Sequence, residues 1–240
     1  YIDRAYPDYD FPVDMRSDSW QKQMLNSQSH YDTTLVPSMV NLWEFLQVQQ
    51  EKNGLKAEKI KVGSMQQIHL EYDTGYQVKI RNMHGNGIGW TGWAEQVFEM
   101  IPTGPYHTSN LPGENSLSIG LRINFGHFDY YTGGDISGNN ADGAPDFNSI
   151  EAQIAPVVGP VDVATLNHHG NRDSQSTYFV RAVRPKVWIG QTWSSDHPGD
   201  DVLRRITSKS LYPGDRLLLA TDMLEANEMV IGGKIYDALQ

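Results

Sequence analysis

The pattern of hydrophobic and polar residues changes along the chain. Residues 1–36 show no sustained period and predict strand and loop, with few helices. Within residues 37–53 the hydrophobic residues recur at positions i, i+3, i+4 and i+7, a spacing that places them on one side of a helix. They are Met39, Leu42, Trp43 and Leu46. This segment therefore predicts a helix with one buried stripe.

Alternating hydrophobic and polar residues predict two hairpins in the middle of the chain. Each consists of two short runs of β-type residues separated by a turn that contains glycine. The first hairpin is expected at residues 68–72 and 76–83, with its turn at 73–75, and the second at residues 117–123 and 128–132, with its turn at Phe125 and Gly126.

The second half of the chain alternates predicted strands with predicted helices. A glycine-rich turn and a short helix at 149–155 come first. Strands are then expected at 161–166, 186–190, 217–221 and 229–235, and helices at 175–183 and 200–208. Such a succession predicts a mixed α/β fold, in which helices cover a sheet. Because neither a linker nor an internal repeat interrupts the pattern, we expect one domain over residues 1–240.

Composition supports a single globular unit. The 240 residues are 39% hydrophobic and 20% charged, with 22 glycines and 12 prolines, a balance typical of a turn-rich globular chain. The longest apolar runs fall far below the ~18 residues that a bilayer requires, so no membrane span is expected. The sequence shows no signal peptide pattern. Cytoplasmic and cell-envelope locations, and the oligomeric state, stay open.

Charge and cysteine content narrow the possible chemistry. The formal net charge of −10 disfavours strong nucleic-acid binding through phosphate neutralisation. This charge does not exclude an enzyme that binds a phosphodiester through metal ions. The chain has no cysteine, which excludes disulfides, thiolate zinc sites and cysteine nucleophiles. Any metal would therefore need histidine and carboxylate ligands.

Candidate site residues follow the predicted strands of the second half. Asp135 comes after two glycines, His168 and His169 stand before a glycine, and His197 precedes a proline. Strand ends are where α/β proteins present side chains to a cleft. Taken singly, each has a structural explanation, since Asp135 could form a turn and His197 could lead into a helix. Their common placement favours a site.

The order of these motifs resembles the C-terminal half of the metallo-β-lactamase superfamily, and most closely its ComEC-like branch. The similarity covers about residues 110–207. It implies a four-layer αββα sandwich with two divalent metal ions, zinc or manganese, at the sheet edge. The motifs are Asn115-Ser116-Leu117, Tyr131-Thr132-Gly133-Gly134-Asp135, Val161-Asp162-Val163, His168-His169-Gly170, Arg184-Pro185-Lys186 and His197-Pro198.

The resemblance also implies a role for each candidate. Asp135 would bridge the metals, and His168 or His169 would be a ligand of the second metal. Whichever of the two rings is not a ligand could donate a proton to a substrate oxygen or leaving group. Asn115 stands where many relatives carry a metal-binding histidine, and His197 would contact the substrate or donate a proton.

The sequence departs from the superfamily at its hallmark H-x-H-x-D-H motif, which is absent. In relatives this motif supplies most ligands of the first metal and precedes all of the motifs above. We therefore expect the domain to be N-terminally incomplete, with the chain truncated, one piece of a larger protein, or a degenerate relative. Metal binding by this chain alone should be partial or absent, and the chain alone should be inactive.

The expected function is that of a metal-dependent hydrolase, in which a metal-activated water attacks a phosphodiester or related ester. The phosphodiester is suggested by fold analogy alone, since the superfamily also cleaves lactams, thioesters and lactones. The rival hypothesis is a noncatalytic domain of the same fold that binds a ligand or partner and has lost its first-metal ligands. An H-x-H-x-D-H motif upstream of Tyr1 would favour the enzyme.

The remaining features predict structural roles. The glycines of residues 85–92 lack the βαβ context of a nucleotide site, so we expect a wide loop flanking the active site, with Trp90 and Trp93 as packing or substrate-facing aromatics. Ser174 and Ser176 are expected to cap a helix. A basic cluster is expected to be a solvated helix face, and five scattered histidines to be ordinary surface or core residues. The cluster is Arg181, Arg184, Lys186, Arg204, Arg205 and Lys209, and the histidines are His30, His69, His84, His107 and His127.

Overall fold

The computed structural model describes seven parts of the chain. They are residues 1–17, 32–72, 75, 77–106, 111–138, 149–193 and 197–222, with the side chains of 32–40 left aside. The chain divides into two compact units, Tyr1–Ile60 with Pro102–Leu111 and Lys61–Ile101 with Pro112–Gln240. The expectation of one domain over residues 1–240 stays a prediction.

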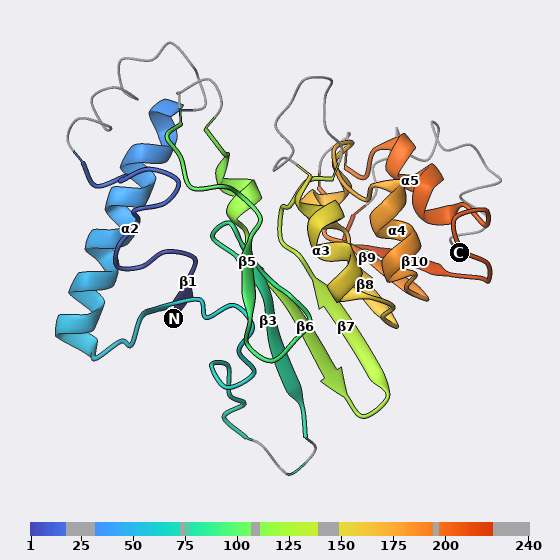
Figure 1. The fold of residues 1–240 in the computed structure, drawn as a ribbon, viewed down its shortest axis with the longest axis horizontal. Helices are drawn as coiled ribbons and strands as arrows, with labels where there is room; N and C mark the ends of the chain where they lie inside the picture. Colours follow the sequence, from blue (N-terminus) through green and yellow to red (C-terminus); the bar gives the residue numbers. More distant parts are fainter. Residues whose placement is uncertain are drawn as a thin grey trace. The chain divides into compact units, whose positions relative to one another are not determined.

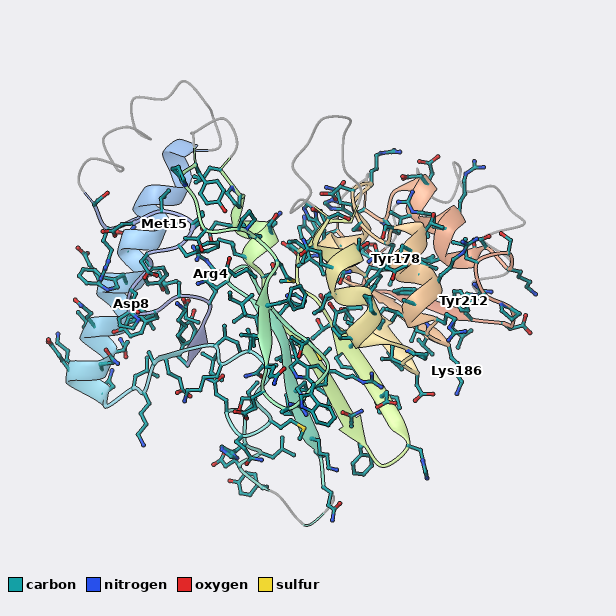
Figure 2. The ribbon with its side chains drawn as sticks, in the orientation of Figure 1. Arg4, Asp8, Met15, Tyr178, Lys186 and Tyr212 are labelled. Carbon is teal, nitrogen blue, oxygen red and sulfur yellow. The ribbon has the colours of Figure 1, made fainter. Side chains whose placement is uncertain are left out.

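The first unit contains one long helix and two short paired strands. Strand β1 (Ile2–Asp3) runs parallel to β2 (Glu58–Lys59), and helix α2 spans Asp32–Asn53. The predicted stripe is confirmed at three of its residues, since Leu46 is buried and Leu42 and Trp43 pack against the same cluster. The side chain of Met39, the fourth, lies outside the described residues. The Arg4 guanidinium reaches the sulfur of Met15, both labelled in Figure 2. The other buried members of this core are Ala5, Tyr6 and Tyr9.

The second unit is built on an eight-stranded mixed sheet (Figure 1). Strands β7 to β10 are parallel, and the remaining neighbours pair in antiparallel fashion. Across the sheet the order is β10 (Leu217–Ala220), β9 (Val187–Gly190), β8 (Val163–Thr165), β7 (Phe128–Thr132), β6 (Gly120–Phe125), β3 (Lys79–Gly85), β4 (Ile88–Trp90) and β5 (Val97–Glu99).

Three helices cover the parallel part of this sheet. Helix α4 (Thr177–Val183) connects β8 to β9, and α5 (Asp200–Thr207) connects β9 to β10. Because parallel crossovers are right-handed and the strand order runs in one direction, α4 and α5 lie on the same face. Helix α3 (Ile150–Val158) packs against α4, and Figure 1 shows α4 between α3 and α5. Tyr131 and Trp188 from the strands and Phe179 from α4 are fully buried beneath them.

The mixed α/β class is confirmed, and most elements of the second half lie where the pattern placed them. Residues 128–132 form β7, and the predicted helix at 200–208 is α5, which ends at Thr207. The described strands belong to the eight-stranded sheet and the two-stranded pair β1–β2. The strand predicted at 229–235 lies outside the described residues. The described parts include no helix that is long and apolar enough to cross a membrane.

Three local predictions are wrong. Residues 68–72 form no strand, since Leu70 and Tyr72 are 45% and 81% exposed and the alternation marks no buried face. Instead β3 pairs with β4 and β6. Leu117, expected in a strand, ends the 3-10 helix η2 (Glu114–Leu117). The expected glycine-rich loop at 85–92 is largely the β3–β4 hairpin, which turns at Asn86 and Gly87 where both residues have positive φ.

Candidate functional site

The predicted site residues lie after three successive parallel strands. Asp135 follows β7, the 3-10 helix η4 (Asn167–Gly170) follows β8, and His197 lies in the segment after β9. Because parallel strands end at the same edge of a sheet, all three segments meet there. Asn115 joins them from η2, which precedes β6, since β6 runs antiparallel to β7 and begins where β7 ends.

Asp135 is held between the start of β6 and the loop after β8. Its backbone N–H donates to the Ser118 hydroxyl at 3.1 Å. Its carboxylate lies 3.3 Å from Nε2 of His169. The Asp135 side chain keeps 35% of its surface exposed, so the carboxylate is accessible from solvent while its backbone is fixed.

His169 presents Nε2 to that carboxylate because its other ring nitrogen is occupied. Nδ1 lies 2.9 Å from the Gln191 carbonyl, which only accepts hydrogen bonds, so Nδ1 carries a proton. In the neutral ring, Nε2 is then unprotonated, and its lone pair faces the Asp135 oxygen. Two such groups repel each other unless a proton or a cation lies between them. The geometry therefore favours a positive charge at this point.

The Asp173 carboxylate orients the ring of His168, as the Gln191 carbonyl orients that of His169. Its Nδ1 lies 2.9 and 3.2 Å from the two oxygens of Asp173, and its Nε2 lies 3.2 Å from the Asn115 side-chain amide. The hydrogen bond that His168 Nδ1 donates to Asp173 raises the pKa of His168. Burial opposes this rise, and the charges of Asp173 and Asp135 add to it. Asp173 was not among the predicted residues, and no spacing in the sequence singled it out.

The third imidazole completes a group of rings at this edge. The His197 ring centroid lies 6.2 Å from that of His168 and 5.8 Å from that of His169. The indole of Trp193 packs edge-on against His169, with a centroid distance of 4.1 Å. The preceding Asp196 lies outside the described residues.

The backbone at the paired histidines adopts an uncommon conformation. His168 and His169 have φ values of 47° and 57°, followed by Gly170 at 78°. A left-handed conformation costs a non-glycine residue about 1–2 kcal/mol. The turn is stabilised by the loop that follows the neighbouring strand β7, because the His168 N–H donates to the Gly134 carbonyl at 3.0 Å. Adjacent strained residues persist where the surroundings fix them, which is common at functional sites.

The buried carboxylate of Glu151 connects the loops of the site through hydrogen bonds. Glu151 of α3 is fully buried and accepts hydrogen bonds from the Asn167 side-chain amide at 2.8 Å and from the backbone N–H groups of Gln175 and Ser176 at 2.7 Å. Burial raises the pKa of Glu151, and these three donors oppose that rise. Its own N–H donates to the Ser137 carbonyl. Glu151 thus fixes the segments on both sides of His168 and the segment after Asp135.

His84, expected to be an ordinary surface or core residue, is a fully buried part of the same support. Its Nδ1 donates to the Ser118 carbonyl at 2.9 Å, and its Nε2 accepts from the Tyr131 hydroxyl at 3.0 Å. Burial lowers the pKa of His84 to about 4, so the ring is neutral. A Cβ on Gly120 would collide with this ring, which explains the glycine there. Through Ser118, His84 supports the backbone of Asp135.

The structure brings Asn115, Asp135, His168, His169 and His197 to one edge of the sheet, while their individual roles remain predictions. The donor types suit a divalent cation, because each paired histidine is fixed at Nδ1, an arrangement typical of metal-binding histidines. Nε2 of His169 faces the Asp135 carboxylate, whereas Nε2 of His168 lies 3.2 Å from the Asn115 amide. Among the residues that the structure describes, no group of three or more histidine, aspartate or glutamate side chains has the spacing of a metal site.

The other sequence features have structural roles. Trp90 stacks on the Arg81 guanidinium at 4.3 Å and donates its indole N–H to the Ala94 carbonyl. Ser176 caps α4 as predicted, whereas the Ser174 hydroxyl donates to the Asn171 carbonyl and to the Gln175 side chain. In the basic cluster, Lys186, Arg205 and Lys209 form ion pairs with Asp162, Asp201 and Asp215 respectively.

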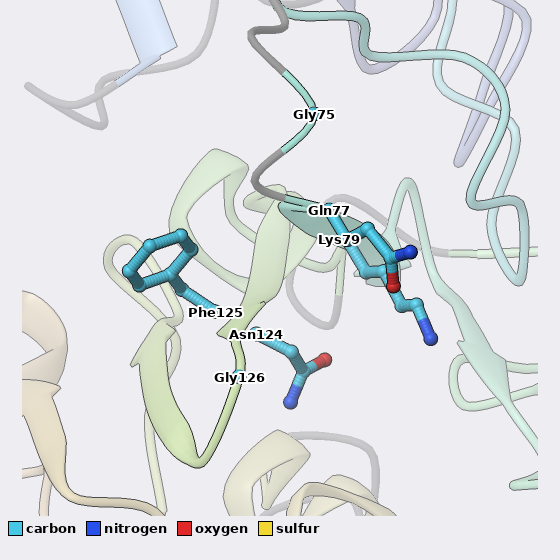
Figure 3. A pocket seen from close by; sticks show the side chains of 6 residues that line it. All are labelled: Gly75, Gln77, Lys79, Asn124, Phe125 and Gly126. Atoms are coloured by element: carbon cyan, nitrogen blue, oxygen red, sulfur yellow. The ribbon is translucent and has the colours of Figure 1, made fainter.

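The cavity shown in Figure 3 is separate from this cluster. It measures about 660 Å³ and is lined by residues that include Lys79, Asn124 and Phe125. The turn at Phe125 and Gly126 lies at the start of β7, whereas Asp135 follows its end. The five residues of β7 separate the two places by about 17 Å. The cavity therefore does not belong to the candidate site.

Comparison with known proteins adds no assignment. No protein-family model matches the chain, and no curated protein compared with it gives a significant match.

Proposed function

We propose that this chain contributes to a metal-dependent hydrolase of the metallo-β-lactamase type, ComEC-like, acting on a phosphodiester or a related ester. The observation that supports it is the contact between the Asp135 carboxylate and Nε2 of His169, a ring whose Nδ1 is fixed by a carbonyl. A lone pair and a carboxylate that face each other at 3.3 Å form a natural position for a cation.

Each residue has an assigned part in this proposal. Asp135 and one or both paired histidines would hold the metal, and Asp173 and the Gln191 carbonyl would orient the rings. When bound, two such ions supply an activated water and offset the charge that develops on the attacked phosphorus. Asn115 would contact a substrate oxygen, and His197, or the paired ring that is not a ligand, would donate a proton to the leaving group.

The proposal includes the ligands that the sequence lacks. The activity would belong to the form of the protein that carries an H-x-H-x-D-H segment, and this chain alone would be inactive. The four-layer αββα sandwich is likewise part of the proposal. It is supported by the order β7 to β10 and by the placement of three motifs at one edge of the sheet.

The test is hydrolysis of bis-p-nitrophenyl phosphate by the complete protein, encoded with its upstream sequence, in the presence of zinc or manganese. We expect metal-dependent turnover that Asp135→Asn reduces at least ~100-fold, because even changes outside the ligand shell cost 10–100-fold. Asp162→Asn, at the opposite end of the parallel strands, should leave the rate unchanged. Full activity of Asp135→Asn would contradict the assignment.

The rival candidate is a noncatalytic ligand-binding domain of the same fold. The absence of H-x-H-x-D-H from this sequence favours it. The upstream coding sequence separates the two. An intact motif together with turnover supports the hydrolase, whereas a complete protein without the motif and without turnover supports the binding domain.

A further inference from the structure

Trp193 forms one side of the imidazole cluster of His168, His169 and His197, and it lies outside the hydrophobic core. Trp193 is 61% exposed, and its ring contacts those of His169 and His197, at 4.1 and 5.8 Å between centroids. On the same segment Trp188 is fully buried and donates its indole N–H to Tyr212 at 3.0 Å (Tyr212 is labelled in Figure 2). Trp193 lies after the end of β9 at Gly190 and, unlike Trp188, is not a core residue.

The backbone beneath Trp193 is anchored. The Thr192 N–H donates to the Thr221 hydroxyl at 2.9 Å, and the Thr221 hydroxyl donates to the Thr192 carbonyl at 2.9 Å. Thr192 is buried, and on its other side the Gln191 carbonyl accepts the hydrogen bond from His169. The indole therefore projects from a fixed segment, so a ligand that meets it need not order the segment first.

We propose that Trp193 forms an aromatic subsite, which binds a planar ring carried by the substrate next to its phosphate group. This inference rests on the proposed function and specifies its substrate class as phosphate esters of planar aromatic groups. A ring stacked on the indole would place its phosphate toward His169 and His197, the two imidazoles that the indole touches. Stacked and edge-to-face aromatic pairs add binding beyond the area they bury.

The test compares two ligands that match in charge and nearly in size but differ in aromaticity, phenyl phosphate and cyclohexyl phosphate. Binding is measured by calorimetry on this chain with manganese present, and no turnover is required. We expect the chain to bind phenyl phosphate about 2- to 12-fold more tightly. Trp193→Phe should keep most of this preference, and Trp193→Leu should abolish it.

Trp93 offers a matched control. It is 72% exposed and lies in the turn between β4 and β5, at the end of β4 away from the site, because β4 begins beside the end of β3. Trp93→Leu should leave the preference unchanged. Equal binding of the two phosphates, or a preference that survives Trp193→Leu, would overturn the subsite. If the preference follows Trp193 but the complete protein hydrolyses no ester, the subsite stands and the hydrolase proposal fails.

Discussion

The two ends of the parallel strands carry different kinds of charged pair. Where the strands begin, carboxylates meet permanent cations. Where they end, carboxylates also meet imidazoles, as Asp135 meets His169 and Asp173 meets His168, beside the Arg172–Asp200 ion pair at 2.7 Å. The pairs at the beginning are Asp129–Arg122 at 3.2 Å, Asp162–Lys186 at 2.8 Å and Asp215–Lys209 at 3.0 Å.

This difference separates pairs whose charges are fixed from pairs in which the imidazole can gain or lose a proton. A carboxylate beside lysine or arginine is neutralised at every ordinary pH, as the lowered pKa of Asp162 beside Lys186 illustrates. A carboxylate beside a neutral imidazole keeps its charge available for a proton or a metal ion. The end that carries the imidazoles also contains the left-handed backbone of His168 and His169. The two ends should therefore respond differently to substitution, pH and metal ions.

The largest expected effect is on stability, at Glu151. Glu151→Ala would leave three buried donors without an acceptor, and we expect the free energy of unfolding to fall by about 3–5 kcal/mol. Chemical denaturation measures this change. Asp162→Ala is the matched control at the opposite end, where exposure and salt screening should make the loss much smaller. Equal losses in the two variants would contradict the role assigned to Glu151.

The second effect is a pH dependence that arises from His84. Its pKa of about 4 lies below the ~6.5 of an unfolded histidine, so below pH ~6.5 the unfolded chain binds a proton that the folded chain does not. The contribution to stability is full above pH ~6.5 and decreases by about 3 kcal/mol as the pH falls to about 4.

His84→Asn removes this group, so the difference in unfolding free energy between the parent chain and the variant should shrink over that range. Should the variant fail to fold, an NMR titration of the parent chain decides, since the His84 ring should stay neutral until the pH approaches 4. Protonation near pH 6.5 in the folded chain would refute the buried, neutral assignment.

The smallest expected effect is a change in one pKa. Asp173→Asn removes the main cause of the raised pKa of His168, so the pKa measured by NMR should fall. A raised pKa contributes stability that is fully present below the unfolded pKa of ~6.5 and is lost as the pH rises through the folded pKa. The variant should therefore be destabilised more at pH 5 than at pH 9. An unchanged His168 titration would show that Asp173 does not orient this ring.

Sequence patterns were sufficient for the parallel strands and for the residues that follow them. Short apolar strands alternating with amphipathic helices predict parallel neighbours, and residues that follow such strands share an edge. The same reasoning failed at residues 68–72, where alternation occurs without a buried face. Local pattern alone therefore does not establish a strand.

The supports of the site could not be predicted for a different reason. His84 and Tyr131 are 47 positions apart, and Glu151 and Gln175 are 24 apart. A single sequence shows which residues are polar but not which polar residues meet in the core. Asp173 is near His168 in the chain, yet a carboxylate five positions away has no regular relation to it outside a helix. Contacts of this kind depend on the tertiary fold.

The central claim is that Asp135 and the paired histidines form one cation-binding cluster at the end of the parallel strands. Manganese added in small amounts to this chain, with the imidazole signals followed by NMR, tests it even where binding is weak. The account predicts that the signals of His168 and His169 broaden first, that exposed His127 at the β6–β7 turn stays sharp, and that Asp135→Asn removes the difference. Equal broadening of His127, or a pattern that persists in Asp135→Asn, would contradict it.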